Sequence, residues 1–363
     1  MSPVPPHVQL AQTRRKPLAP GRRPRAARLA LLLAVALCAS ASAGCGRFIK
    51  SQVSVPQLLS PLAEADTARL IEEVNALSRV RSIRGKADIQ FLDNSFAQCG
   101  VVEKYKTADA DITTQRPGQI YLTIQDPFIG SKIAEMSSDG TNFWVAVLKG
   151  EEKYRRFLKG TNEAQYERIG GGGGADCDGK GKKQSAMEQR AVSAFSGLRP
   201  QHFTDALLIR PVAEAGAGLV YSRNETFAEE PDVRTGAKKN ARVVRGYYQL
   251  EELKTEGEGR ARLLRRFWFD RVGGVRLARM QTFDDRGQLT TDIIYRDPKA
   301  FGEGGAHRLP AEIEITRPQD HYSIRINYQS PEAVRLDQLF PPTAFVLENR
   351  EKLQEVDLDA KKK

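Results

Sequence analysis

The side chains that most often do chemistry in proteins are few in this sequence, and they are not spaced for it. Only four His and four Cys occur in 363 residues. His202, His307 and His321 lack neighbours at metal-ligand spacing, and no Gly-x-Ser-x-Gly nucleophile motif occurs. Asp284-Asp285 is typical of a turn rather than of an acid–base pair. The sequence therefore predicts no catalytic residue, no metal site and no cofactor.

One cysteine has a reaction that the residues before it predict. Residues 22–28 are mostly basic, residues 29–37 are apolar and residues 39–44 are small, which is the order of a signal peptide. Ser42-Ala43-Gly44-Cys45 resembles a bacterial lipobox, in which the Cys is lipidated and becomes the first residue of the mature protein. Cys38 is the poorer candidate, because it directly follows Leu37 rather than a small residue. We predict a signal peptide over 1–44, lipidation at Cys45 and a lipidated tether over 45–60.

This leader also predicts where the protein resides. Its apolar run, residues 29–43, is shorter than the roughly 20 residues of a spanning helix, which disfavours the alternative of an uncleaved membrane anchor. Acyl chains on Cys45 would attach the protein to membrane lipid without such a helix. Gly46 follows the Cys where inner-membrane lipoproteins commonly have Asp. By that resemblance, the protein is expected at the outer membrane, facing the periplasm.

The charge of the chain belongs mainly to the leader. The sequence has 56 Lys and Arg against 45 Asp and Glu, a net +11. Residues 1–45 contain seven of these cations and no acid, which leaves 49 against 45, or +4, for the remainder. A charge of this size gives no reason to expect a nucleic-acid partner. With 40% hydrophobic residues, the remainder can bury a core.

The remainder reads as one helix followed by many short strands. Leu70, Ile71, Val74 and Leu77 recur with helical period, which predicts a helix over about 62–80 with Asp66 as its N-cap. Period-2 alternation, without the spacing of βαβ units, predicts an antiparallel meander of about a dozen strands. The expected strands lie near 83–91, 100–113, 119–124, 132–137, 142–148, 153–158, 243–253, 262–270, 275–283, 289–296, 310–316 and 321–328. Two further helical stretches are expected at about 185–196 and 200–209.

Two segments interrupt this pattern. Residues 161–184 contain the run Gly170–Gly174, which is no phosphate-binding loop because no Gly-Lys-Ser/Thr ends it. Residues 228–241 are polar and rich in turn formers. We expect both to be flexible insertions in one domain over 61–335, followed by a C-terminal extension over 336–363.

Three stretches of the chain follow a pattern of hydrophobicity and turns that is known from one family. The first two are Leu-Ile-Glu-Glu-Val-Asn-Ala-Leu at 70–77 and Ile-Arg-Gly-Lys-Ala-Asp-Ile-Gln-Phe at 83–91. In the third, 120–144, a strand ends in Pro127-Phe128-Ile129-Gly130 and the chain turns back through Asp139-Gly140 into an aromatic strand. With these stretches, and loosely over 60–330, the chain resembles the LolA/LolB-like superfamily of periplasmic lipoprotein carriers and receptors.

The resemblance implies an α+β fold in which helices cover an incomplete antiparallel β-barrel around a cavity for acyl chains. A half-barrel can fill itself with side chains or stay open for one ligand. The expected inward side chains pack as plain core or line the cavity; they are Phe91, Ile120, Leu122, Phe143, Val145, Phe267, Phe269 and Tyr322.

Phe128 and Ile129 form an apolar pair at an expected loop tip, where polar residues are usual. Either the tip folds back under the helix as core, or it protrudes and contacts membrane lipid or delivers acyl chains, as the loop of receptor-type relatives does.

Two thiols remain in the mature chain, Cys99 and Cys177, and an oxidising periplasm makes a disulfide between them a further expectation.

The function these features favour is binding and transfer or insertion of lipid or lipoprotein acyl chains at the outer membrane, with a periplasmic carrier as a candidate partner. The alternative is a structural or regulatory lipoprotein that binds a periplasmic protein through the same fold. An enzyme whose site only the folded chain assembles ranks third.

Overall fold

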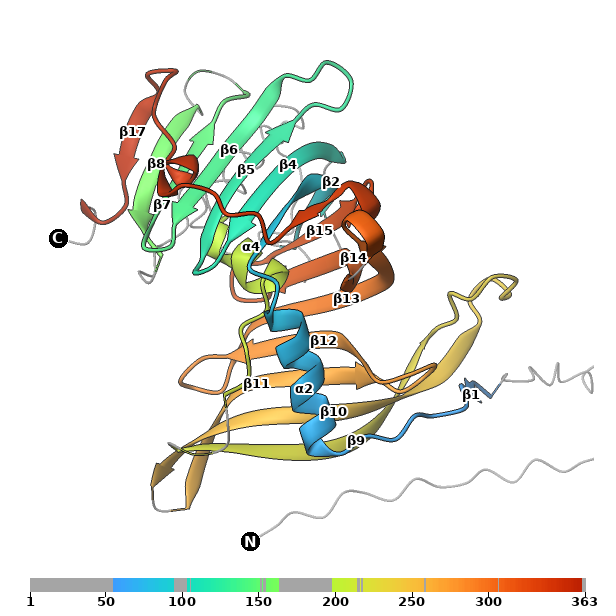
Figure 1. Ribbon diagram of the computed structural model, residues 1–363. Helices are drawn as coiled ribbons and strands as arrows, with labels where there is room; N and C mark the ends of the chain where they lie inside the picture. The colour runs from blue at the N-terminus through green and yellow to red at the C-terminus, as the bar shows by residue number, and fades with distance from the viewer. Residues whose placement is uncertain are drawn as a thin grey trace, which may run out of the picture. The chain divides into compact units, whose positions relative to one another are not determined.

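The computed structural model describes residues 55–94, 103–104, 106–150, 152, 155–162, 198–213, 216, 218–257, 259–305 and 307–360. Residues 56–363 form one compact unit. Figure 1 shows two α-helices and many strands in it. The helices are α2 (Thr67–Ser78) and α4 (Pro200–Leu207). The strands are β1 (Gln57–Leu58), β2 (Ser82–Asp93), β3 (Glu103–Lys104), β4 (Ala108–Gln115), β5 (Gln119–Gln125), β6 (Lys132–Asp139), β7 (Asn142–Val147), β8 (Arg156–Thr161), β9 (Leu219–Pro231), β10 (Arg242–Gly257), β11 (Arg260–Asp270), β12 (Arg276–Phe283), β13 (Leu289–Phe301), β14 (His307–Arg317), β15 (Tyr322–Tyr328), β16 (Arg335–Leu336) and β17 (Gln354–Asp357).

The strands form one large, mainly antiparallel sheet. Neighbours follow the order β9, β10, β11, β12, β13, β14, β15, β2, β4, β5, β6, β7, β8, β17. The short β1 pairs with β10, while β3 and β16 pair with β2. Only β1–β10 and β8–β17 are parallel among the described pairings. The predicted fold class, a mostly β meander with covering helices, is confirmed.

Helix α2 forms where the apolar period predicted a helix. The Asp66 side chain accepts a hydrogen bond from the Arg69 backbone N–H at 2.8 Å, so the predicted N-cap is confirmed. Leu70 and Val74 lie fully buried on one face of the helix. That face packs across the sheet at β9 and β12.

Turn chemistry fixes the register of the β6–β7 hairpin. Asp139 Oδ1 accepts hydrogen bonds from the backbone N–H groups of Thr141 and Asn142, at 2.8 and 2.7 Å. Gly140 has a φ of 102°, and a Cβ there would lie 2.7 Å from the Pro117 carbonyl oxygen. Only glycine fits this turn, as the Asp139-Gly140 pair predicted.

Several segments differ from the expected pattern. Strand β9 runs from Leu219 to Pro231, so it includes the first four residues of the expected insertion at 228–241. Within the expected C-terminal extension, β17 adds a parallel strand beside β8, and Leu358 is buried. The expected helix at 185–196 and most of the insertion at 161–184 lie outside the described residues.

Candidate functional site

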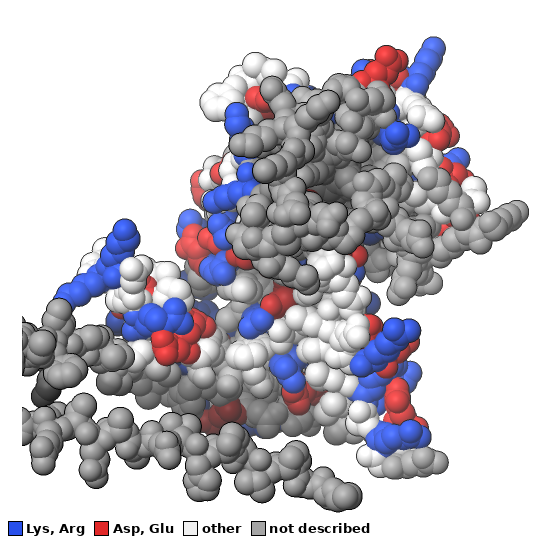
Figure 2. All heavy atoms as spheres, turned by 180° about the vertical axis from the view of Figure 1, so that it is seen from behind, with Lys and Arg blue, Asp and Glu red and all other residues white. Residues whose placement is uncertain are grey.

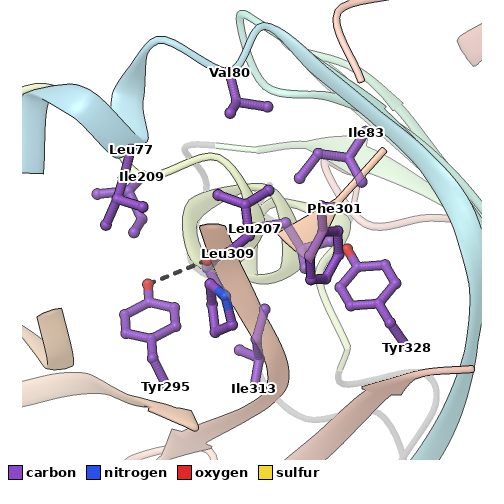
Figure 3. Close-up of a pocket in the computed structure, with 12 residues that line it drawn as sticks. Leu77, Val80, Ile83, Leu207, Ile209, Tyr295, Phe301, Leu309, Ile313 and Tyr328 are labelled. Carbon is purple, nitrogen blue, oxygen red and sulfur yellow. Dashed lines mark hydrogen bonds between the residues drawn. The ribbon is translucent and has the colours of Figure 1, made fainter. Parts of the chain in front are cut away.

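An apolar pocket lies where the end of α2 and the helix α4 meet the sheet (Figure 3). Strands β13 and β14 form its floor, and its volume is about 20 Å³, roughly the space of a single water. Twelve residues line it: Leu77, Val80, Ile83, Ala206, Leu207, Ile209, Tyr295, Phe301, Leu309, Pro310, Ile313 and Tyr328. In this conformation the pocket is too small to hold a ligand larger than a water molecule.

Helix α4 closes the pocket because its apolar residues face the sheet. Its buried side chains include Phe203, Ala206 and Leu207. The Tyr295 hydroxyl on β13 donates a hydrogen bond to the Ala206 carbonyl oxygen at 3.1 Å, the dashed line in Figure 3. Burial raises the pKa of the Tyr295 phenol, which therefore stays a neutral donor. One hydrogen bond thus joins the end of α4 to the sheet.

Two polar contacts join α2 to the segment that follows α4. The Val212 backbone N–H donates to Asn75 Oδ1 at 2.8 Å, and Asn75 Nδ2 donates to the Val212 carbonyl oxygen at 3.2 Å. From the β4–β5 turn, the Arg116 guanidinium donates to the carbonyl oxygens of Val80 and Ile209, at 2.9 and 2.7 Å. These few bonds hold both helices over the pocket.

A second cavity, of about 270 Å³, is lined in part by Arg116. Its lining also includes Asn162, Asp205 and Arg210. An acyl chain bound there would take these polar and charged groups out of water, which is costly. The smaller pocket is therefore the better match to an acyl ligand.

The eight side chains predicted to point inward are all buried. Phe91 and Tyr322 stack with ring centroids 5.6 Å apart, and the Tyr322 hydroxyl shares a hydrogen bond with His202 Nδ1. The other six, on β5, β7 and β11, are less than 1% exposed: Ile120, Leu122, Phe143, Val145, Phe267 and Phe269. All eight pack in one core cluster, and none lines the apolar pocket. A cavity role for them stays a prediction.

The residues that do line the pocket were not singled out from the sequence. Tyr295 and Ile313 lie in strands that alternation predicted, but alternation does not tell which strand meets the helices. Leu77 was predicted on the apolar stripe of the helix. No signal in the sequence predicted that this apolar stripe and α4 would line the same pocket.

The predicted apolar loop between β5 and β6 protrudes. Phe128 is 90% exposed and Ile129 is 74% exposed, so the tip does not fold back as core. Asp126 Oδ1 accepts the backbone N–H of Phe128 at 3.0 Å, and its Oδ2 accepts from Lys149 Nζ at 2.9 Å. The Lys149 hydrogen bond, with those from the loop backbone, lowers the pKa of Asp126. Gly130, with a φ of 67°, completes the return.

The remaining predicted site residues, Cys45, Cys99 and Cys177, lie outside the described residues. Neither described helix is long and apolar enough to cross a membrane. In the described part of the chain, no group of three or more His, Cys, Asp or Glu residues could hold a metal ion. Figure 2 views the molecule from the side opposite to Figure 1. On the described part of this face, Lys and Arg are interspersed with Asp and Glu.

Comparisons with known proteins give similarities to solved structures alone. No family model matches the sequence, and no curated protein matches it. A LolA superfamily protein from Nitrosomonas europaea is 12% identical, with a TM-score of 0.37, over 78% of this chain and 99% of its own. An outer membrane lipoprotein-sorting protein domain from Vibrio parahaemolyticus is 12% identical, with a TM-score of 0.34, over 78% of this chain and 97% of its own.

Proposed function

We propose that this protein is a lipid-anchored component of the outer membrane that binds acyl chains of lipids or lipoproteins and assists their transfer or insertion there. One observation carries the proposal: two large apolar side chains, Phe128 and Ile129, stand in solvent at the tip of a loop that hydrogen bonds hold in shape. The exposure of these two side chains to water is unfavourable, whereas their contact with lipid is favourable. Burying one of them in a membrane is worth about 2 kcal/mol, enough to favour contact without anchoring the protein.

The apolar pocket supplies the place for an acyl chain. Ligand sites usually enclose about 300 Å³ or more, so the pocket must widen from its present 20 Å³. Displacement of α4 would widen it, because Ala206 and Leu207 form one wall. Displacing α4 would break its hydrogen bonds to Tyr295 and Tyr322 and the bond from Arg116 to Ile209, each worth about 1 kcal/mol net. It would also expose Phe203 and Leu207, so a bound acyl chain must cover the apolar surface that α4 leaves.

The anchor is the part of the proposal that the N-terminal sequence supports. Diacylglycerol on the Cys45 thiol would place the chain on the membrane that the loop is proposed to touch. With Cys45→Ala we expect no incorporation of labelled palmitate and release into the periplasmic fraction, or persistence of the precursor. Incorporation of palmitate into that variant would contradict the assignment.

The loop is tested with Phe128→Glu in the Cys45→Ala chain, which removes any contribution of the anchor to binding. We expect the melting temperature to be nearly unchanged, because Phe128 has no core to leave, and liposome association to fall sharply. Ser131→Glu is the matched control, since it adds the same charge to an exposed position of the same loop and keeps the apolar pair. Equal liposome binding by the two variants would overturn the role of Phe128.

Native mass spectrometry of the gently extracted protein tests the acyl ligand. Co-purifying lipid or acyl chains would support the proposal. A protein free of lipid but bound to a polypeptide would instead favour the structural or regulatory lipoprotein.

A further inference from the structure

Among the described strands, β9 lies at the end of the sheet and pairs with β10 alone, so its other edge is open in the described part of the chain (Figure 1). It has 13 residues, more than twice the usual length of about five or six. Exposed strand edges are usually guarded by charged side chains, especially Lys, by Pro or by a bulge. This strand has no Lys, its one Pro is its last residue, and its pairing with β10 is regular from Leu219 to Pro231. Its charged residues include both signs, Arg and Glu, which can pair with each other across two copies.

The register shows which backbone groups of β9 face outward. In the ladder, Gly218 pairs with Thr255 through a 2.7 Å hydrogen bond, and Asp232 with Ala241 through one of 2.8 Å. Even-numbered residues of β9 therefore face β10, and the odd-numbered ones face away. At the middle of the strand, the outward N–H and C=O groups belong to Tyr221, Arg223, Glu225 and Phe227, and no described backbone group bonds them. Leu219, at the start of the strand, bonds Gly216.

We propose that β9 pairs antiparallel with β9 of a second copy of this chain, about a two-fold axis through Asn224. In this register Arg223 faces Glu225 of the partner, and Tyr221 faces the partner's Phe227. Because the axis is two-fold, each of these pairs occurs twice. They exchange backbone hydrogen bonds, so these four central residues of each strand are satisfied.

Side chains on both faces of the strand suit this pairing. On one face, the Arg–Glu pairs lie between two aromatic pairs, and cross-strand pairs of these types are stabilising. Phe227 is 53% exposed in the single chain and would be covered. On the other face, Val220, which is 46% exposed, would lie opposite the partner's Ala228.

Charge favours this register over the two alternative registers in which the axis passes through an adjacent residue. A two-fold axis through Glu225 would set Glu225 against itself, and one through Arg223 would set Arg223 against itself. Like charges directly opposite one another are destabilising. Glu225 also binds Arg271 in its own chain, at 2.8 Å, and its side chain keeps 45% exposure with room for the partner's Arg223.

Cysteine cross-linking tests the register in the full chain. At the axis the two copies of position 224 form a non-hydrogen-bonded pair with Cα atoms about 4.5 Å apart, within disulfide range. Asn224→Cys should therefore give a dimer on a non-reducing gel, with position 224 linked to itself by peptide mapping. Thr226→Cys is the control, because its two copies would be about 14 Å apart and should not link. Equal cross-linking of both variants would overturn the register.

Sedimentation equilibrium of the full chain in density-matched detergent tests the dimer itself. The mass should approach that of two chains as concentration rises. Phe227→Pro removes one outward N–H from each copy and leaves the β10 ladder intact, so the dimer dissociation constant should rise about tenfold or more. Phe227→Ser is the control, since it removes the ring but keeps the N–H, and it should weaken the dimer less. Thermal melting confirms that both variants fold. A single-chain mass at every concentration would overturn the proposal.

Discussion

Asn75 on α2 satisfies both backbone polar groups of Val212, accepting from its N–H at 2.8 Å and donating to its carbonyl oxygen at 3.2 Å. Val212 is buried, so no solvent replaces these bonds when the amide is removed. Asn75→Leu should therefore lower the free energy of unfolding by about 1–3 kcal/mol, the cost of leaving buried groups unpaired. Urea denaturation measures the loss.

The control for Asn75→Leu is Glu72→Ala on the same helix. Glu72 forms an exposed ion pair with Arg69, at 2.8 Å, and such pairs contribute little. If Asn75→Leu were no more destabilising than Glu72→Ala, the bonds between α2 and Val212 would not hold the helix in place.

Local signals in the sequence predicted most of the described fold. Asp66 predicted the start of α2, Asp139-Gly140 predicted the β6–β7 turn, and alternation predicted most of the strands. Each signal acts within a few residues, through a cap, a turn or the period of burial. Alternation over residues 321–328, for example, corresponds to β15 at Tyr322–Tyr328.

The remaining elements depend on partners far along the chain. Strand β9 was missed because most of it is exposed or half-exposed on both faces, so burial leaves no alternating pattern in its sequence. β1 pairs in parallel with β10, and β17 with β8. Parallel partners are not joined by a tight turn, so no turn signal in the sequence predicts these pairs. The pocket arises where α4 and the end of α2 cover the same part of the sheet, and nothing in the sequence of either helix specifies the other.

His202 should make stability depend on pH. Burial, and then the charges of Arg317 and Arg199, hold the pKa of His202 well below its usual value. The folded protein therefore keeps this imidazole neutral, whereas the unfolded chain takes up a proton below its ordinary pKa of about 6.5. Stability is complete above that pH and falls below it, by about 1.4 kcal/mol at one pH unit lower.

Denaturation at pH 7.5 and pH 5.5 measures this dependence. His202→Gln removes the proton uptake, so its loss of stability between the two pH values should be smaller by about that 1.4 kcal/mol. His307→Gln is the control, because the His307 side chain is 38% exposed. An unchanged pH dependence in His202→Gln would show that another group causes it.

We expect Cys99 and Cys177 to form a disulfide in the mature chain. They are separated by 78 residues, so closing that loop would restrict the unfolded chain by about 4 kcal/mol in the entropy model. Thiol titration of the denatured, unreduced protein should detect neither cysteine, and Cys99→Ser should expose one. Two free sulfhydryls in the unmodified chain would contradict the pairing.

Asp126 should determine how firmly the loop presents Phe128 and Ile129. Its carboxylate accepts both of their backbone N–H groups and the Lys149 ammonium. Asp126→Ala removes all three bonds, so we expect faster amide exchange at Phe128 and Ile129 and weaker liposome association. The rest of the fold should melt unchanged, because no core side chain is altered. Hydrogen exchange read by mass spectrometry or NMR measures the effect.

Asp126→Asn separates the hydrogen bonds from the charge. The amide oxygen can still accept from the loop backbone, but the ion pair with Lys149 is lost, so protection should lie between that of the wild type and Asp126→Ala. Because the pKa of Asp126 is lowered, its contribution is complete above the ordinary Asp value of about 3.9 and is lost as the pH falls through the lower folded value. Protection of the Phe128 amide should thus persist at pH 4 and decrease only in stronger acid. Equal exchange in all three proteins would mean that Pro127 and Gly130 alone shape the tip.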